Sequence, residues 1–120
     1  MEDYTLVLRE LVNKDIEKIK IEIPETTKLE FEKTAENFFA KDLVLDAIKV
    51  FTLTKNMKRL DEIGYECIKN TKPELAFKAF YFSRNKEGLN KTGEEFLKQS
   101  EIENALSSFR LAEKKEMVDF

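Results

Sequence analysis

Apolar residues recur at spacings of three and four along this chain, which indicates helices with one buried face. In the middle of the chain they form two groups on either side of a polar stretch: Leu60, Ile63 and Cys67, then Leu75, Phe77 and Phe80. The first group predicts a helix over about 57–70, and the second predicts another helix after a short turn. Because a short turn brings the chain straight back, the two helices should pack antiparallel.

The same pattern returns with a period of 29 residues. Residues 60–88 and 89–117 agree at nine of 29 positions without a gap, and residues 31–59 agree with the last copy at seven. The recurring positions are apolar or small: Phe31, Leu60 and Leu89; Ala35, Gly64 and Gly93; Ala47, Ala76 and Ala105; Phe51, Phe80 and Phe109. A fixed period of this length is the signature of a repeat architecture, so we expect each copy to be one helical hairpin.

A short polar residue stands at the expected turn within each copy, at Asp42, Thr71 and Ser100. Each is predicted to cap the next helix through its side-chain oxygen, and a glutamate three residues after Thr71 and Ser100 completes a capping box. Asn56 and Asn85 occupy matching positions between copies, where asparagine either ends one helix or caps the next.

The copies read Leu60-x2-Ile63-Gly64-x2-Cys67 with Ala76-x3-Phe80, and Leu89-x2-Thr92-Gly93-x2-Phe96 with Ala105-x3-Phe109. This pattern resembles the tetratricopeptide repeat, W-x2-L-G-x2-Y followed by A-x3-F and P. The tryptophan and the final proline are missing, and the period is shorter than that family's. The helical repeats of clathrin and coatomer heavy chains are similar. The resemblance implies an all-α fold, a right-handed α-solenoid of three antiparallel helical hairpins within residues 27–120.

The two ends of the chain depart from the repeat. Apolar positions in residues 3–12 predict an amphipathic helix, whereas residues 16–23 fit either a helix or a strand. We expect residues 1–26 to form N-terminal capping helices that cover the end of the repeats. Residues 116–120 align with the opening of a fourth copy, so we expect the chain either to be part of a longer protein or to contact another chain through its ends, as a homo-oligomer.

The amino-acid composition excludes several kinds of catalytic and ligand-binding site. The chain has no histidine, one cysteine and three separated glycines, which excludes histidine-dependent nucleophilic catalysis, Cys/His zinc sites and glycine-rich phosphate loops. We expect no enzyme activity, no cofactor and no metal; acid–base catalysis by paired carboxylates is a weaker alternative. Cys67 is predicted to be a buried hydrophobe. Phe77, Phe80 and Phe82 are predicted core residues, and Tyr65 and Tyr81 are predicted to point outward.

The net charge and the hydropathy indicate which classes of partner are disfavoured and where the protein is expected to be located. The net charge is −3 and no basic stripe stands out, which disfavours nucleic acid as a partner. No apolar run approaches the ~18 residues of a membrane span, so no membrane contact is expected. The acidic start, Met1-Glu2-Asp3, is unlike a secretory signal, and a cytoplasmic location is expected.

The resemblance also implies a candidate binding surface, because in that family the first helices of the hairpins line a concave face. The positions on that face are Glu32, Glu36, Asp61, Tyr65, Lys69, Asn90, Glu94 and Lys98. Their mixed, mildly acidic character favours a partner with basic residues, and the alternative is an ordinary solvated face. We therefore expect a noncatalytic protein–protein interaction module that binds a protein or peptide. The alternative is a structural self-assembly element or a fragment of a larger helical-repeat protein.

Overall fold

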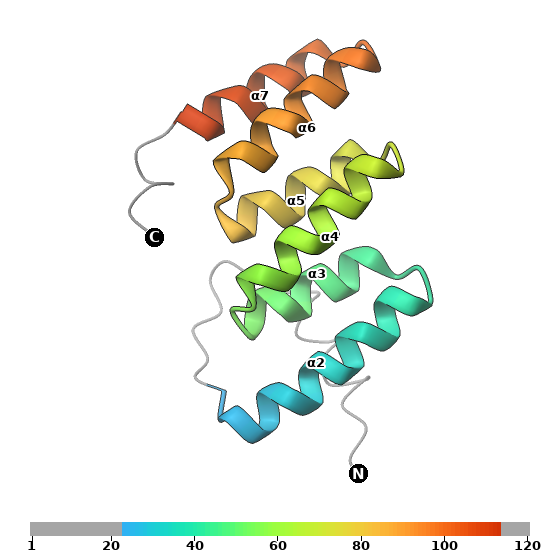
Figure 1. Ribbon diagram of the computed structural model, residues 1–120, viewed down its shortest axis with the longest axis vertical. Helices are drawn as coiled ribbons and strands as arrows, with labels where there is room; N and C mark the ends of the chain where they lie inside the picture. The colour runs from blue at the N-terminus through green and yellow to red at the C-terminus, as the bar shows by residue number, and fades with distance from the viewer. Residues whose placement is uncertain (1–22, 114–120) are drawn as a thin grey trace. The chain divides into compact units, whose positions relative to one another are not determined.

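The computed structural model describes residues 23–113, and in this range it contains six α-helices and no strand (Figure 1). The helices are α2 (Glu25–Ala40), α3 (Val44–Leu53), α4 (Met57–Lys69), α5 (Pro73–Ser83), α6 (Lys86–Lys98) and α7 (Ile102–Glu113). The predicted all-α fold is confirmed, and the helix expected over 57–70 is α4. The helix predicted over 3–12, most of the ambiguous segment 16–23 and the predicted start of a fourth copy lie outside the described residues.

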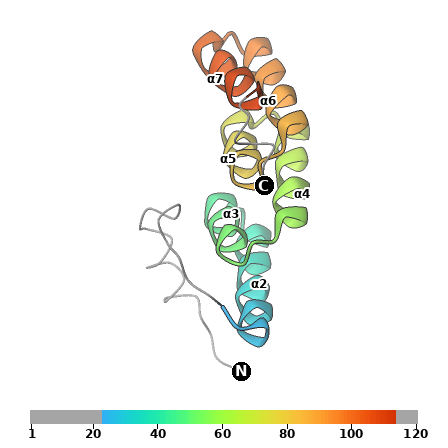
Figure 2. The same cartoon turned by 90° about the vertical axis from the view of Figure 1, so that its left-hand side faces the viewer.

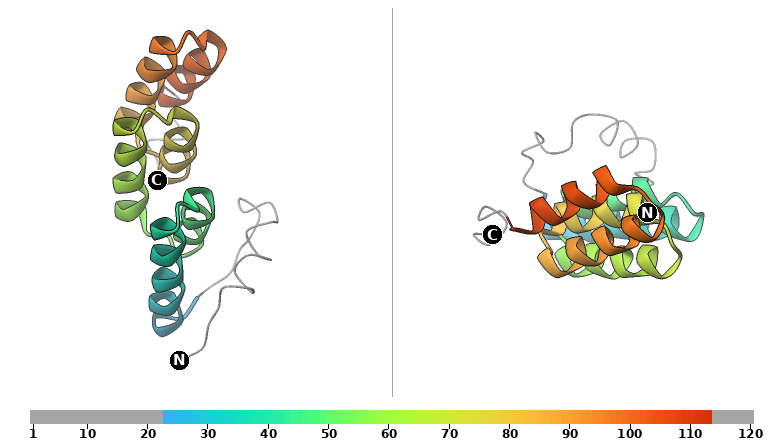
Figure 3. Two further views of the ribbon diagram at one scale, coloured as in Figure 1. Left: turned by 90° about the vertical axis from the view of Figure 1, so that its right-hand side faces the viewer. Right: turned by 90° about the horizontal axis from the view of Figure 1, so that it is seen from above.

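Contacts divide the structure into two compact units, with the boundary between Asn56 and Met57. In the first unit α2 packs against α3. In the second unit α4 packs against α5 and α6 against α7, and α6 also contacts both α4 and α5. The four helices of the second unit form two layers, with α4 and α6 in one and α5 and α7 in the other (Figures 2 and 3).

Five residues in the left-handed backbone conformation build the turns between the helices, with φ between 57° and 63°: Asp42, Lys55, Thr71, Arg84 and Ser100. At Thr71 the backbone N–H donates to the carbonyl of Ile68 over 3.0 Å, and the N–H of Lys72 donates to the carbonyl of Cys67 over 2.8 Å. This pair of bonds is a Schellman motif, and equivalent pairs occur at the other four turns. The left-handed positions repeat with the same 29-residue period as the sequence.

The predicted N-caps at Asp42, Thr71 and Ser100 are therefore wrong, because each of these residues ends the preceding helix. Leu43 and Lys72 occupy the N-cap positions of α3 and α5, and neither makes a side-chain capping bond. Short polar residues are common both at N-caps and in tight turns, so residue type alone did not separate two adjacent positions.

The asparagine position between copies behaves differently, because Asn85 does cap a helix. Its Oδ1 accepts a hydrogen bond of 2.9 Å from the backbone N–H of Gly88 in the first turn of α6. Of the two roles predicted for this position, Asn85 therefore takes the capping role.

Thr71→Gly should stabilise the protein by about 0.5–1 kcal/mol, because a β-branched residue is strained at positive φ and glycine is not. Thr71→Ala should change stability little, since alanine also disfavours this conformation. If Thr71 were an N-cap, glycine would cost a few tenths of a kcal/mol and alanine about 1 kcal/mol. Urea denaturation of the two variants distinguishes the Schellman motif from the cap by the sign of the glycine effect.

All three glycines of the chain lie in helices of the second unit, where a phenylalanine ring packs against the bare backbone. A Cβ added to Gly64 would lie 2.6 Å from Cε1 of Phe80, and one added to Gly88 would come even closer to the same ring. A Cβ on Gly93 would likewise lie 2.6 Å from Phe109. Phe80 is fully buried between α4 and α6, so these glycines are required by close packing.

The burial of the remaining predicted core positions is mixed. Cys67 is only 3% exposed and Ala76 is fully buried, as predicted. Phe77 and Phe82, predicted to be core residues, are only half-buried. Tyr81, predicted to point outward, is also half-buried, with its ring stacked on Phe77 at 6.2 Å and edge-on to Phe82 at 5.4 Å. Because these three rings cover one another on the surface of α5, none is either fully buried or fully solvated.

Candidate functional site

The eight predicted binding residues lie on the first helix of each pair. Glu32 and Glu36 belong to α2 in the first unit; Asp61, Tyr65 and Lys69 belong to α4, and Asn90, Glu94 and Lys98 to α6. The structure brings together the six residues on α4 and α6, since these two helices are in contact. Six of the eight are exposed, whereas Glu32 and Asp61 are half-buried.

Tyr65 is held in one orientation on this face. Its ring meets Phe80 edge-on with a centroid distance of 4.8 Å, and its hydroxyl accepts a hydrogen bond of 3.3 Å from Nδ2 of Asn85. The Nζ of Lys91 lies 5.6 Å from the ring centroid, within the range of a cation–π contact. With 36% of its surface exposed, Tyr65 is an oriented aromatic side chain between α4 and α6.

Around Tyr65 the face carries charges of both signs. Lys69, Asn90 and Glu94 are exposed, and the Nζ of Lys98 lies 3.6 Å from Oε2 of Glu95 on its own helix. Glu95 is 9% exposed, so part of the positive charge of Lys98 is directed at a nearly buried carboxylate. Part of the charge of Lys98 is therefore engaged within its own helix, and contact of Lys98 with a partner stays a prediction.

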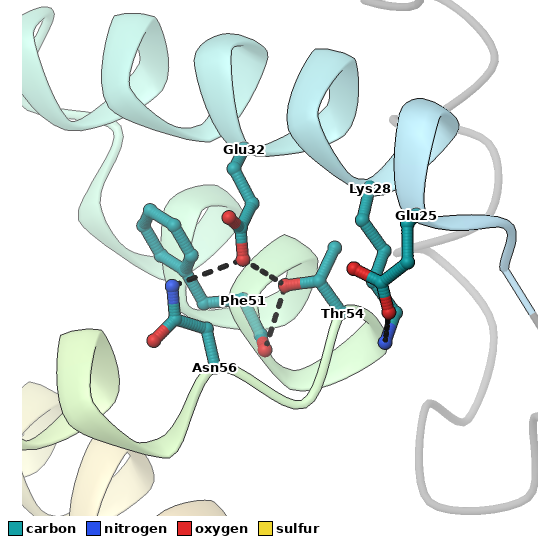
Figure 4. Close-up of polar contacts among 6 residues, drawn as sticks. All are labelled: Glu25, Lys28, Glu32, Phe51, Thr54 and Asn56. Atoms are coloured by element: carbon teal, nitrogen blue, oxygen red, sulfur yellow. Dashed lines mark hydrogen bonds and ion pairs between the residues drawn. The ribbon is translucent and has the colours of Figure 1, made fainter.

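Glu32 has a structural role within the first unit. Its Oε2 accepts hydrogen bonds of 2.9 Å from Oγ1 of Thr54 and 2.9 Å from Nδ2 of Asn56, which joins α2 to the turn after α3 (Figure 4). The Thr54 hydroxyl is also 3.2 Å from the carbonyl of Phe51. Thr54 has one proton to donate, and the shorter contact is to Glu32. Oε2 of Glu32 is therefore engaged within the first unit, and contact of Glu32 with a partner stays a prediction.

Glu32→Ala should lower the stability of the first unit by about 1.5–3 kcal/mol, since hydrogen bonds to a charged acceptor are lost at a partly buried site. Glu32→Gln keeps an acceptor oxygen in place and should cost less. Glu36→Ala, at an exposed position one turn along α2, should stay within about 0.5 kcal/mol. Urea denaturation of the three variants checks this order, and an equal loss for all three would refute it.

Asp61 occupies the position of Glu32 in the next copy, but its surroundings differ. Its Oδ1 is buried and has no hydrogen-bond partner among the described residues. The aspartate side chain is one methylene shorter than glutamate. The two groups equivalent to those that bind Glu32 point elsewhere: Ser83 donates to the carbonyl of Phe80, and Asn85 donates to Tyr65. Because this oxygen is buried, less of the Asp61 carboxylate is accessible to a partner than its position on the predicted face suggests.

A cavity of about 380 Å³ lies on the other side of the second unit, between α5 and α7. It is lined by Glu74, Phe77 and Lys78 of α5, Phe96 of α6, and Asn104 and Ser107 of α7. The two phenylalanines supply its apolar part and the other four side chains its polar part. The sequence pattern did not indicate this site, because it placed Phe77 in the core, whereas the side chain is only half-buried.

The α6–α7 pair also exposes large apolar side chains. Leu97 is 49% exposed, Leu106 46% and Ile102 62%. Ile102 and Leu106 are four residues apart on α7, so they share one side of that helix. Single exposed leucines are ordinary, but several on one helix pair form a candidate contact surface.

Two further properties of the described residues bear on function. Across residues 23–113, no group of three or more histidine, cysteine or acidic side chains is arranged to hold a metal ion. Within the same range, none of the helices combines the length and the apolar character needed to cross a membrane.

Comparison of the chain with protein-family models, with curated proteins and with solved structures found no match in any of the three.

Proposed function

We propose that this chain is a noncatalytic protein–protein interaction module, a right-handed α-solenoid of tetratricopeptide-like hairpins that binds a protein or peptide. Two observations support the repeat. The left-handed turn residues recur every 29 residues. The contact between Gly64 and Phe80 also recurs one period later, between Gly93 and Phe109. Repeat proteins of this type present extended surfaces rather than reaction centres.

The observation that carries the binding proposal is the oriented Tyr65 on the α4–α6 face. Exposed tyrosines contribute strongly to interfaces because they bury a large, rigid, amphipathic surface. Phe80, Asn85 and Lys91 already restrict the ring, so little further ordering is needed when a partner covers it. Glu94, exposed on the adjacent helix, favours a partner that carries lysine or arginine.

The test is quantitative capture of partners from an extract of the source, with the full chain immobilised. Tyr65→Ala should reduce the captured partner at least about tenfold, since truncating a central aromatic contact costs about 2 kcal/mol or more. Glu94→Lys should also reduce it, because the reversed charge repels a basic partner. Glu74→Lys on α5 is the matched charge reversal and should leave capture unchanged. A partner retained equally by wild type, Tyr65→Ala and Glu94→Lys would contradict the proposal.

One further variant separates this face from the cavity between α5 and α7. Ser107→Arg places a long side chain at the cavity and leaves the α4–α6 face untouched. Loss of the partner with Ser107→Arg, together with retention by Tyr65→Ala, would move the binding site to the cavity.

The second candidate function is a structural self-assembly element or a segment of a larger helical-repeat protein. It is favoured by the exposed Leu97, Ile102 and Leu106 on the α6–α7 pair, which have the character of a contact surface.

A further inference from the structure

An apolar row on α7 leads from two exposed residues to Phe109, which packs against Gly93 of α6, and among residues 23–113 no second helix covers the exposed part of the row. Ile102 and Leu106 are exposed, and Phe109, one turn further, is half-buried. One period earlier, on α5, the corresponding residues are Pro73, Phe77 and Phe80: the first is buried, the second half-buried and the third fully buried.

On α5 the last of these residues, Phe80, is covered by α6, whose Gly88 lies directly against its ring, whereas Phe77 lines the cavity between α5 and α7. Phe80 therefore shows what the last position of this row does when the next helix covers it: its ring packs against that helix. The row on α7 has the same apolar pattern, so a helix is the element that fits it.

The charges beside this row indicate which helix. Glu103 and Arg110 are both exposed, and they lie seven residues apart, which is about two turns, on the same side of α7 as each other. Their midpoint falls beside Leu106. If a second α7 packs antiparallel across a twofold axis near Leu106, Glu103 of each copy lies opposite Arg110 of the other.

We propose that α7 is the contact helix of a twofold-symmetric homodimer, in which the two α7 helices pack antiparallel. Leu106 lies at the centre, Ile102 of each copy packs toward the Phe109 end of the other, and two Glu103–Arg110 pairs border the apolar contact. Closed twofold contacts are the commonest form of homo-oligomer and place the same patch on both sides. One helix face is a small interface, so the dimer is a weak, concentration-dependent one.

This inference does not rest on the proposed partner binding, since it uses neither Tyr65 nor Glu94. The test is sedimentation equilibrium of the full chain from about 10 µM to about 1 mM, a range suited to a transient interface. The average mass should rise from that of one chain toward that of two. Leu106→Glu should hold the protein at one chain throughout. Leu29→Glu is the matched control, because Leu29 on α2 is 62% exposed, and it should dimerise like wild type.

Charge reversal tests the antiparallel arrangement itself. Glu103→Arg and Arg110→Glu should each weaken dimerisation about threefold to tenfold, since each breaks both exposed pairs and opposes like charges. The double variant re-forms both pairs with their signs exchanged, so its dissociation constant should return to within about threefold of wild type.

A single-chain mass at about 1 mM, a dimer that survives Leu106→Glu, or a double charge reversal that does not restore association each overturns the proposal. The proposal is also overturned if the chain assembles beyond two copies and Leu29→Glu weakens that assembly as much as Leu106→Glu does. That result would point to contacts elsewhere on the chain. Circular dichroism establishes that each variant remains helical, and the substituted residues are exposed, so folding should be preserved.

Discussion

Ala76→Glu should unfold the second unit. Ala76 is fully buried in α5, and α5 packs against both α4 and α6. A carboxylate at this position either loses its hydration without a partner or forces the helices apart, and either outcome costs several kcal/mol. A single domain has only about 5–15 kcal/mol of stability, so this substitution removes most or all of it.

The measurement is thermal and urea denaturation followed by circular dichroism. Ser107→Glu adds the same charge at an exposed position on α7 of the same unit and should retain the wild-type transition. A cooperative transition for Ala76→Glu within about 1 kcal/mol of wild type would mean that α5 is not packed as described.

Phe80→Ala should lower the free energy of unfolding by about 3–5 kcal/mol, as expected for removal of a fully buried phenylalanine from a rigid core. The ring fills the space between Gly64 and Gly88, and neither glycine has a side chain that could move into the cavity left behind. Phe82→Ala, on the same helix but half-buried, should cost clearly less.

A double-mutant cycle tests the contact itself. Gly88→Ala alone should destabilise by about 1–3 kcal/mol, because its Cβ would overlap the Phe80 ring. In the Phe80→Ala background the same change should be neutral or stabilising, since the ring is gone and alanine is the better helix former by about 1 kcal/mol. Additive effects of the two substitutions would refute close packing of Gly88 on Phe80.

The large-scale features of the fold were predictable because the repeat supplies the same information more than once. The bounds of α4 and the burial of Cys67 and Ala76 followed from apolar residues at helical spacing. Alignment of the copies strengthened these predictions, because a position that is small or apolar at each 29-residue step is under the same packing constraint each time.

Features that depend on one or two residues were not predictable. The aligned copies place arginine, glycine and methionine at the position of Gly88, so nothing in the repeat marked it as a contact. Glu32 and Asp61 share a position as well, yet one carboxylate is bonded to Thr54, while the other has a buried oxygen that finds no partner among residues 23–113. One methylene and the orientation of neighbouring amides decide between these outcomes, and neither is visible in a pattern of residue types.

The sequence by itself determined that the chain folds as helices, and it located helix α4 and the recurring buried positions. Apolar residues at helical spacing within a short segment are enough to define the buried face of a helix. The tertiary structure decided which residue of each turn is left-handed, which glycines meet a ring, and which apolar side chains on α6 and α7 remain uncovered. The glycine contacts and the exposure of these apolar side chains depend on how closely helices that are separated in the sequence pack together. A residue type can satisfy two adjacent backbone positions equally well, and only the path of the chain between packed helices selects one of them.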